Sequence, residues 1–297
     1  MLTRHLQSSM PNINSNLDDF DFVAPSVTGT SSSKMVFDAY LVTKKEIERL
    51  PKEFRTDSEL AIHTLLKKNL NIDQSGTKLF RKRLDANESL AKYWLARVSE
   101  AANFIEAWRS PPAFKPIDTK FLEQFARLSV EAEHINLVEQ HLANYGIIVV
   151  HERSIPGMKV DGASFLLASG RPVVALSLRY SRLDIYWFVL MHELAHVSAH
   201  YSKLIEPILD DVDSDSQDDL EIEANSIAAN SLIPRNVWRS ANARYNSSEA
   251  EILELARKAK THPAIVAGRL QRESGKHYLF ADIVNSVNTR QIIFGHE

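Results

Sequence analysis

The ten residues Met191–His200, MHELAHVSAH, constrain the fold and chemistry of this chain more than any other segment. They contain the pattern H-E-x-x-H, in which His192 and His196 stand four residues apart. On an α-helix such residues lie one turn apart on one face, so that two imidazoles can bind the same metal ion. Glu193, beside the first histidine, is a candidate general base that takes a proton from water. The segment therefore predicts a helix that carries part of a catalytic zinc site.

The same five-residue pattern also occurs by chance, so its surroundings matter. The β-branched run IIVVHE predicts a strand, and SFLLASGRPVVALSL predicts a hairpin that turns at Ser169 and Gly170. Ser181 and Asp184 are spaced as in a capping box, which predicts that the helix begins there. Because the chain has no cysteine, His, Asp or Glu must bind any metal. A capped helix after a strand hairpin favours a metal site over a chance match.

His200 continues the spacing of four residues, but we do not expect it to be a ligand. At the rise of an α-helix, His192 and His200 would be about 12 Å apart along the axis, too far to share one ion. The pattern H-E-x-x-H-x-x-G-x-x-H requires a glycine where this chain has Ala199. We expect His200 at the helix end, where the dipole favours it, and outside the site.

A third ligand is needed, because catalytic zinc takes three protein ligands and an open position. The segment Asp218–Pro234, DDLEIEANSIAANSLIP, predicts a helix on which Glu221 falls on the apolar face and Glu223 on the polar face. A carboxylate in a core is costly unless it is paired or bound to metal, which favours Glu221. Glu223 stays open as the alternative ligand, and both could instead stabilise the helix N-terminus. Asn225 is expected to orient a ligand from behind.

Three regions are predicted along the chain. Residues 1–34, rich in Ser and Asn, predict a disordered tail. Residues 35–116 predict a helical N-terminal region, because KKEIERL, SELAIHTLLKKNL and ESLAKYWLARVSEAANFIEAWRS have helical periodicity, and a linker at SPPAFKP. Residues 117–297 predict an α+β domain with a helix at 118–145, a small antiparallel sheet, the H-E-x-x-H helix, and helices at about 218–232, 248–259 and 263–274.

Net charge and hydropathy limit the cellular location and the binding partners that we expect for this protein. The formal net charge of -3 gives no general attraction to nucleic acid or to an anionic membrane. The first residues contain no apolar core of a secretory signal, and no apolar run approaches the ~20 residues that span a bilayer. We therefore expect a cytoplasmic protein without a membrane partner, whose oligomeric state the sequence leaves open.

HELAH, EIEAN and SLIP follow one another here as they do in the ImmA/IrrE metallopeptidases, and this chain resembles that family from about residue 117 to about residue 285. The resemblance implies a zincin-like, gluzincin-like domain in which His192, His196 and Glu221 bind zinc and Glu193 is catalytic. The chain is most similar to the branch fused to HigA-type antitoxins. It departs from that branch because residues 1–34 do not form a recognisable helix-turn-helix domain. Ala195 replaces the usual glycine of HELGH.

The resemblance implies a zinc-dependent endopeptidase that cleaves a regulatory protein, such as a helix-turn-helix repressor or an antitoxin partner, in stress response or mobile-element control. The alternative is a non-catalytic antitoxin or transcription regulator that binds DNA or a toxin. It rests on SEAEILELARKAKTHPAIVAGRLQRE, which predicts two helices around a short turn with basic residues nearby. The acidic balance makes direct nucleic-acid binding the less favoured expectation. A pseudo-enzyme that binds a partner through residues 36–110 is a third possibility.

Two further elements of an active site are expected. The strand Val173–Leu178, just before the H-E-x-x-H helix, is predicted to bind an extended substrate by strand addition. Tyr180, Tyr201 and Arg269 are candidates to stabilise the oxyanion, and the sequence does not rank them. For each of the three, an ordinary structural role is the competing interpretation.

Overall fold

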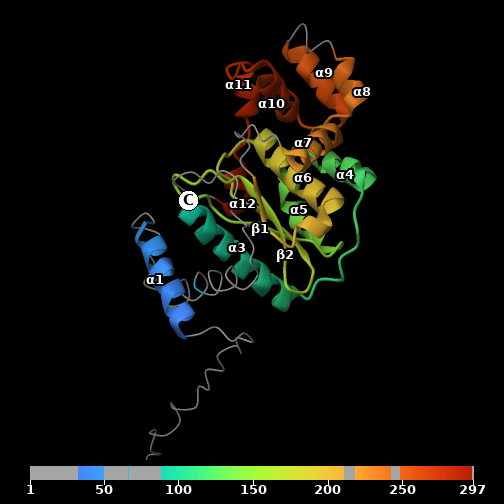
Figure 1. Cartoon of the computed structure of the whole chain (residues 1–297). Coiled ribbons are helices and arrows are strands. Elements are labelled where there is room, and N and C mark those ends of the chain that lie inside the picture. The colour runs from blue at the N-terminus through green and yellow to red at the C-terminus, as the bar shows by residue number, and fades with distance from the viewer. Residues whose placement is uncertain (1–32, 50–65, 67–87, 211–217, 242–247, 296–297) are drawn as a thin grey trace, which may run out of the picture.

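A computed structural model describes residues 33–49, 66, 88–210, 218–241 and 248–295 (Figure 1). Residues 1–32, which make up most of the predicted tail, lie outside this part of the chain. The predicted N-terminal helical region contains α1 (Ser33–Arg49) and α3 (Glu88–Arg109). Of the helices that are described, none is long and apolar enough to cross a membrane.

The sheet has four short strands, which are β1 (Ile148–His151), β2 (Gly162–Leu166), β3 (Pro172–Leu176) and β4 (Ile208–Asp210). Their order is β1-β3-β2-β4. The predicted hairpin is confirmed: β2 and β3 are antiparallel, and Gly170 turns with a φ of 80°. The sheet is mixed rather than antiparallel, because β1 pairs in parallel with β3. All five residues of β3 are buried, as suits a strand between two neighbours.

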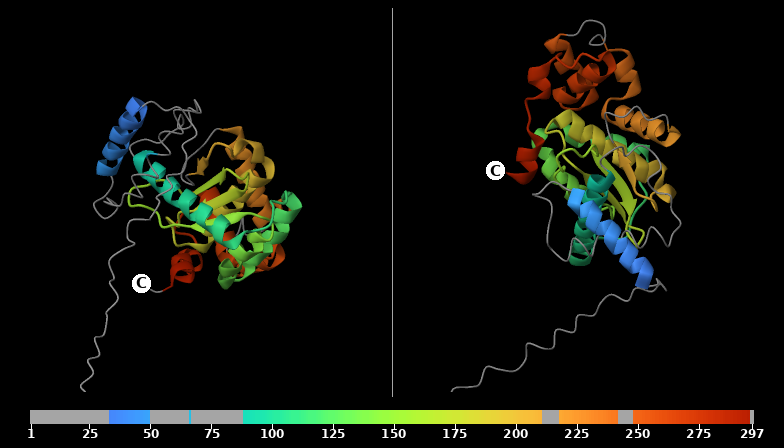
Figure 2. Two further views of the ribbon diagram at one scale, coloured as in Figure 1. Left: turned by 90° about the horizontal axis from the view of Figure 1, so that it is seen from below. Right: turned by 60° about the vertical axis from the view of Figure 1, so that its left-hand side comes forward.

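The two faces of the sheet pack against different helices. Helix α3 lies against one face, and α6 (Leu183–Ala199) lies against the other (Figures 1 and 2). Side chains alternate along each strand, so Val173 and Ala175 join the core beneath α3. Val174 and Leu176 join the core around α6. The sheet therefore separates two apolar cores, and the H-E-x-x-H helix belongs to only one of them.

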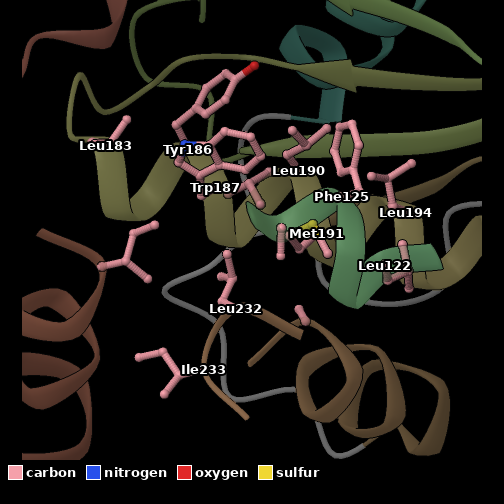
Figure 3. Packing of buried hydrophobic residues seen from close by; sticks show 14 of the residues in the cluster. Leu122, Phe125, Leu183, Tyr186, Trp187, Leu190, Met191, Leu194, Leu232 and Ile233 are labelled. Atoms are coloured by element: carbon pink, nitrogen blue, oxygen red, sulfur yellow. The ribbon is translucent and has the colours of Figure 1, made fainter. Parts of the chain in front are cut away.

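Helix α6 is buried around most of its circumference, including its apolar residues Trp187, Leu190 and Leu194. Figure 3 shows Leu190 and Leu194 beside Leu122 and Phe125 of α4 (Thr119–Phe125). Such all-round burial rigidly fixes any side chain that the helix carries. Packing on every side, rather than a polar outer face, is what places the H-E-x-x-H residues inside the protein.

The predicted capping box at the start of α6 is wrong. Arg182 is the N-cap residue, and no side chain caps the helix there. The Asp184 carboxylate instead accepts hydrogen bonds from Arg182 Nε and Nη2 at 3.0 and 2.8 Å. It also packs against Gly268 of α10 (Pro263–Ser274), where a side chain would overlap it. Asp184 therefore joins α6 to a later helix, which local spacing could not indicate.

The single helix predicted at 118–145 is broken. It consists of α4, two 3-10 turns and α5, whose bounds are Thr119–Phe125, Ala126–Val130, Ala132–Leu137 and Val138–Ala143. The Ser129 hydroxyl donates to the carbonyl of Ala126 and pairs with Thr261, and Glu131 is extended. Such local bonds of serine compete with the helical ladder. The predicted ends are nevertheless correct, since Asp118 caps α4 and Gly146 has a φ of 72°.

The described residues after β4 are mainly helical, as predicted. Its helices are α7 (Asp219–Leu232), α8 (Arg235–Arg239), α9 (Glu249–Ala259), α10 (Pro263–Ser274), α11 (Ala281–Val284) and α12 (Thr289–Phe294). Figure 1 shows α7 alongside α6. Asp218 caps α7 and thereby fixes the residue at which the helix begins. The first turn of α7, which contains Glu221, lies against the H-E-x-x-H segment.

Candidate metal centre

Helices α6 and α7 bring two imidazoles and one carboxylate together. The Nε2 atoms of His192 and His196 lie 2.9 Å apart. Glu221 Oε2 lies 3.1 Å from His192 Nε2, and Glu221 Oε1 lies 3.6 Å from His196 Nε2. Both histidine side chains are fully buried, whereas the Glu221 side chain is 16% exposed. Within the described residues, these three form a group whose donor atoms could hold one metal ion.

The spacing of this group fits a metal ion. A tetrahedral zinc ion with bonds of about 2.0–2.1 Å holds its ligand atoms roughly 3.3 Å apart. The distances between donor atoms here, from 2.9 to 3.6 Å, lie around that value. Two imidazole nitrogens and one carboxylate oxygen are also a ligand set of catalytic zinc, which leaves a position for water. The group therefore has the geometry and the chemistry of a metal centre.

The protonation states of Glu221 and His196 favour the binding of a cation. Burial raises the pKa of Glu221, but hydrogen bonds to His192 and His196 outweigh it and hold the pKa at about 2. Burial lowers the pKa of His196, and its hydrogen bond to Glu221 opposes this in part. At neutral pH the site thus offers an ionised carboxylate and a neutral imidazole, the forms that bind metal.

Asn225 lies behind the first histidine, as predicted for a residue that orients a ligand. Its Oδ1 is 3.1 Å from His192 Nδ1. An amide oxygen only accepts hydrogen bonds, so Nδ1 of His192 carries the hydrogen. When a metal ion takes the place of the hydrogen bond between His192 Nε2 and Glu221, this nitrogen would offer its lone pair to the ion. Asn225 thereby selects the tautomer of His192 that can bind a metal.

His200 contacts the second histidine, contrary to the expectation that it stands outside the site. It is the C-cap residue of α6 and is buried. Its Nδ1 lies 3.0 Å from His196 Nδ1, and its Nε2 lies 3.2 Å from Glu223 Oε2. Glu223 is therefore engaged away from the converging donor atoms, and His200 joins it to the cluster from behind.

The candidate base, Glu193, is fully buried and packed against β2. The Ser164 hydroxyl donates to the Glu193 carboxylate and, at 3.1 Å, to the Glu193 carbonyl. Gly162 lies so close that a Cβ there would overlap the carboxylate and come within 2.8 Å of Val189 Cγ1. Sequence reasoning missed both residues of β2. The alternation of GASFL contained the signal, because it puts the glycine and the serine on the face toward α6.

The three oxyanion candidates have different surroundings. Tyr201 donates a hydrogen bond to Gly170 and stacks on Phe114, so it holds the hairpin turn. Arg269 lies over the Trp238 ring and donates to two carbonyls at the end of α7. Both side chains are therefore occupied in contacts that hold the fold together.

Tyr180 lies in a second group of polar residues. Its hydroxyl is 3.2 Å from Arg179, which pairs with the buried Asp161 at 2.9 Å. Asp161 directly precedes Gly162, the glycine that packs against Glu193. Tyr180 therefore belongs to a group of polar residues that ends beside Gly162, which lies against the candidate base Glu193.

The prediction that Val173–Leu178 binds a substrate strand is wrong. β3 lies between β1 and β2, and both of its edges are paired. The strand at the sheet edge next to β2 is β4, which pairs with Gly162–Ser164. An internal strand cannot accept a further strand, and only position in the sheet decides which strand is internal.

A family comparison agrees with this geometry. Residues 143–271 match the family model for the IrrE N-terminal-like domain, peptidase family M78. The matched span runs from the end of α5 to α10, and so contains all three residues of the cluster and Glu193. A comparison with curated proteins found no match.

Proposed function

We propose that this chain, in which residues 143–271 are a domain of the ImmA/IrrE metallopeptidase family, is a zinc-dependent endopeptidase. In this proposal His192, His196 and Glu221 bind the metal and Glu193 is the general base. The observation that carries it is the approach of two buried imidazole nitrogens and one carboxylate to within 3.6 Å of one another. Buried ionisable groups are stabilised by pairing or by a metal ion, and the convergence of three donor atoms on one point favours the metal.

The chemistry divides between the metal and the chain. A bound zinc ion supplies a Lewis acid that lowers the pKa of water and polarises a peptide carbonyl. Glu193 accepts the proton of the attacking water and then delivers it to the leaving amine nitrogen. Ser164 holds its carboxylate by a hydrogen bond, and Gly162 lets the strand approach closely. The base therefore keeps one orientation while the substrate reacts.

For substrate binding we propose the outer edge of β4, which pairs with no further strand among the described residues. An extended peptide that adds to a sheet edge gains backbone hydrogen bonds along its length. β4 is the edge strand that pairs with Gly162–Ser164, the segment that touches Glu193. A peptide on this edge would lie alongside β2, whose residues Gly162 and Ser164 contact Glu193. This edge replaces Val173–Leu178 in the proposal.

The proposed substrate is a regulatory protein, such as a helix-turn-helix repressor or an antitoxin partner, cleaved in the cytoplasm during stress or mobile-element induction. The family resemblance motivates this choice of substrate. The alternative is a DNA-binding regulator, and it rests on the basic residues of α9 and α10. These helices support it less than the metal cluster supports a peptidase. Arg257 pairs with Glu254, Arg269 lies over Trp238, and Arg272 lies over Phe188. These three arginines thus have acidic or aromatic partners within the fold.

Cleavage by purified, zinc-loaded protein tests the proposal. Wild-type protein should cut the repressor whose gene neighbours its own, and Glu193→Gln should bind zinc equally but not cut. Asp219→Asn, which changes an exposed carboxylate at the start of α7, serves as the matched control and should cut normally. Equal cleavage by Glu193→Gln and wild type would exclude Glu193 as the base.

A further inference from the structure

We propose that His200 and Glu223 position His196 for metal binding, through a chain of hydrogen bonds that ends at the protein surface. Neither residue is a ligand in this arrangement. The inference rests on the proposed function, because it assumes that the cluster binds a metal. It assigns a role to His200, the third histidine of Met191–His200, and to Glu223, the second glutamate of EIEAN.

The chain of contacts is short and runs outward. His196 Nδ1 lies 3.0 Å from His200 Nδ1, and His200 Nε2 lies 3.2 Å from Glu223 Oε2. The His196 side chain is fully buried, the His200 side chain is 5% exposed, and the Glu223 side chain is 59% exposed. A buried ligand is thus connected to a solvated carboxylate through a single imidazole.

The positions of the hydrogens follow from the chemistry of imidazole. A neutral imidazole has one N–H and one lone pair. If Nε2 of His196 gives its lone pair to a metal, its hydrogen is on Nδ1 and is donated to His200 Nδ1. His200 must then accept with Nδ1, so its own hydrogen is on Nε2 and is donated to Glu223. The carboxylate therefore selects one tautomer of both rings.

Such outer partners affect metal binding directly. A hydrogen bond from the far nitrogen of a ligating histidine fixes the orientation of the ring and makes the ligand more basic. The two histidines of this cluster have different partners: Asn225, a neutral amide, accepts from His192, whereas a histidine backed by a carboxylate accepts from His196. Through this longer chain, the charge of Glu223 acts on His196.

Helix geometry explains why a third histidine follows at the same spacing. Residues four apart lie on one face of a helix, so His200 comes one turn after His196. The helix ends there: His200 has a φ of −121° and a ψ of 22°, and its N–H donates to the His196 carbonyl at 2.8 Å. The ring therefore lies behind His196 and not beside the metal position. One spacing thus produces two ligands and one positioning residue.

Substitutions at His200 separate positioning from packing. His200→Leu fills a similar space but cannot accept a hydrogen bond. His200→Gln offers an amide oxygen to His196 and an amide N–H to Glu223. If His200 only fills space, both variants should bind metal alike. If it positions His196, the glutamine should restore what the leucine loses.

The experiment measures metal affinity of the full chain, by competition with a chromophoric chelator, together with the visible spectrum of the cobalt(II) form. We expect His200→Leu to weaken zinc binding about 10–100-fold and to shift the cobalt bands. His200→Gln should recover most of the affinity. Thermal unfolding of the metal-free proteins establishes that each variant is folded.

Glu223 supplies an independent arm, because its exposed side chain can be changed without disturbing the core. Glu223→Ala should weaken zinc binding in the wild-type background and have no further effect in His200→Leu, since it acts through His200. Equal affinities and spectra for wild type, His200→Leu and Glu223→Ala would overturn the inference alone. A wild-type protein that binds no metal would overturn the proposed function and this inference with it.

Discussion

The two faces of the central sheet are built for different purposes. Beneath α3, side chains such as Trp94, Leu95 and Phe165 form a buried apolar cluster. On the α6 face the apolar core continues, but it also encloses His192, Glu193 and His196, all fully buried. Buried ionisable groups oppose folding unless they are paired or bind a metal. The comparison indicates that the α3 face is packed by apolar side chains, whereas the α6 face also encloses ionisable groups whose burial must be offset by pairing or by a bound metal.

Strand β2 shows this division residue by residue. Ala163 and Phe165 point into the α3 cluster. Gly162 and Ser164 point the other way, against Glu193. A strand that packed apolar cores on both faces would have apolar residues at all four positions, as β3 does. Gly162 and Ser164 therefore mark the place where β2 approaches α6.

The largest effect on stability should come from the α3 face. Trp94→Ala should lower the free energy of unfolding by about 3–5 kcal/mol, because it removes a fully buried ring and leaves a cavity. Zinc affinity of the folded fraction should not change. Chemical denaturation and chelator competition measure the two quantities. A large loss of zinc affinity at full folding would show that the two faces are coupled.

On the α6 face, a substitution at Glu193 should affect catalysis strongly and stability little. Glu193→Gln should reduce kcat about 10²–10⁴-fold, the range for loss of a general base. The free energy of unfolding should stay the same or rise, since the variant removes a buried carboxylate. Cleavage kinetics and urea denaturation test both statements. A marked loss of stability would mean that Glu193 is primarily a structural residue.

Gly162→Ala should affect both quantities at once. The added methyl group would overlap the Glu193 carboxylate, so the strand or the side chain must move, at a cost of about 1–3 kcal/mol. Cleavage should fall with it, because the base loses its orientation. Ala163→Gly, one residue along and on the other face, is the control that should lower stability without a specific loss of kcat.

The smallest expected effect is a pH dependence on the α3 side. Hydrogen bonds from Ser169 and Arg171 lower the pKa of Glu106 below its ordinary 4.5. A lowered pKa in the folded state stabilises the protein above pH 4.5, and this contribution disappears as the pH falls through the folded-state pKa. Glu106→Gln should therefore destabilise by less than about 1 kcal/mol at neutral pH, since the side chain is 25% exposed and solvent screens its ion pair with Arg171.

Denaturation of wild type and Glu106→Gln at a series of pH values measures this difference. The two curves should converge below pH 4.5. Zinc affinity at neutral pH should be identical, because the pair joins α3 to the hairpin turn and not to α6. A difference that grew as the pH fell would contradict the assigned direction of the pKa shift.

Local signals predicted much of the fold. Helices α7, α9 and α10 begin and end within one residue of their predicted limits, because capping residues and a helical period mark them. The errors come from distant contacts. The bond between Ser129 and Thr261 accompanies the break in the helix predicted at 118–145. The pairing of β1 with β3 likewise depends on how separate segments meet.

The candidate site divides in the same way. The spacing within α6 and the apolar face of α7 singled out His192, His196 and Glu221, which lie together in the structure. The contacts of His200 with His196 and Glu223 could not be predicted, because they depend on where α6 ends and how α7 crosses it. Periodicity finds side chains that share a helix face, but only packing shows which atoms meet behind them.

The number of zinc ions bound per chain tests the central claim most directly. Elemental analysis after dialysis should find one zinc per chain in wild type and none in Glu221→Ala. Glu223→Ala should still bind one ion at saturating zinc, because its carboxylate contacts His200 and not the converging donor atoms. Loss of zinc from Glu223→Ala with full retention in Glu221→Ala would contradict the account.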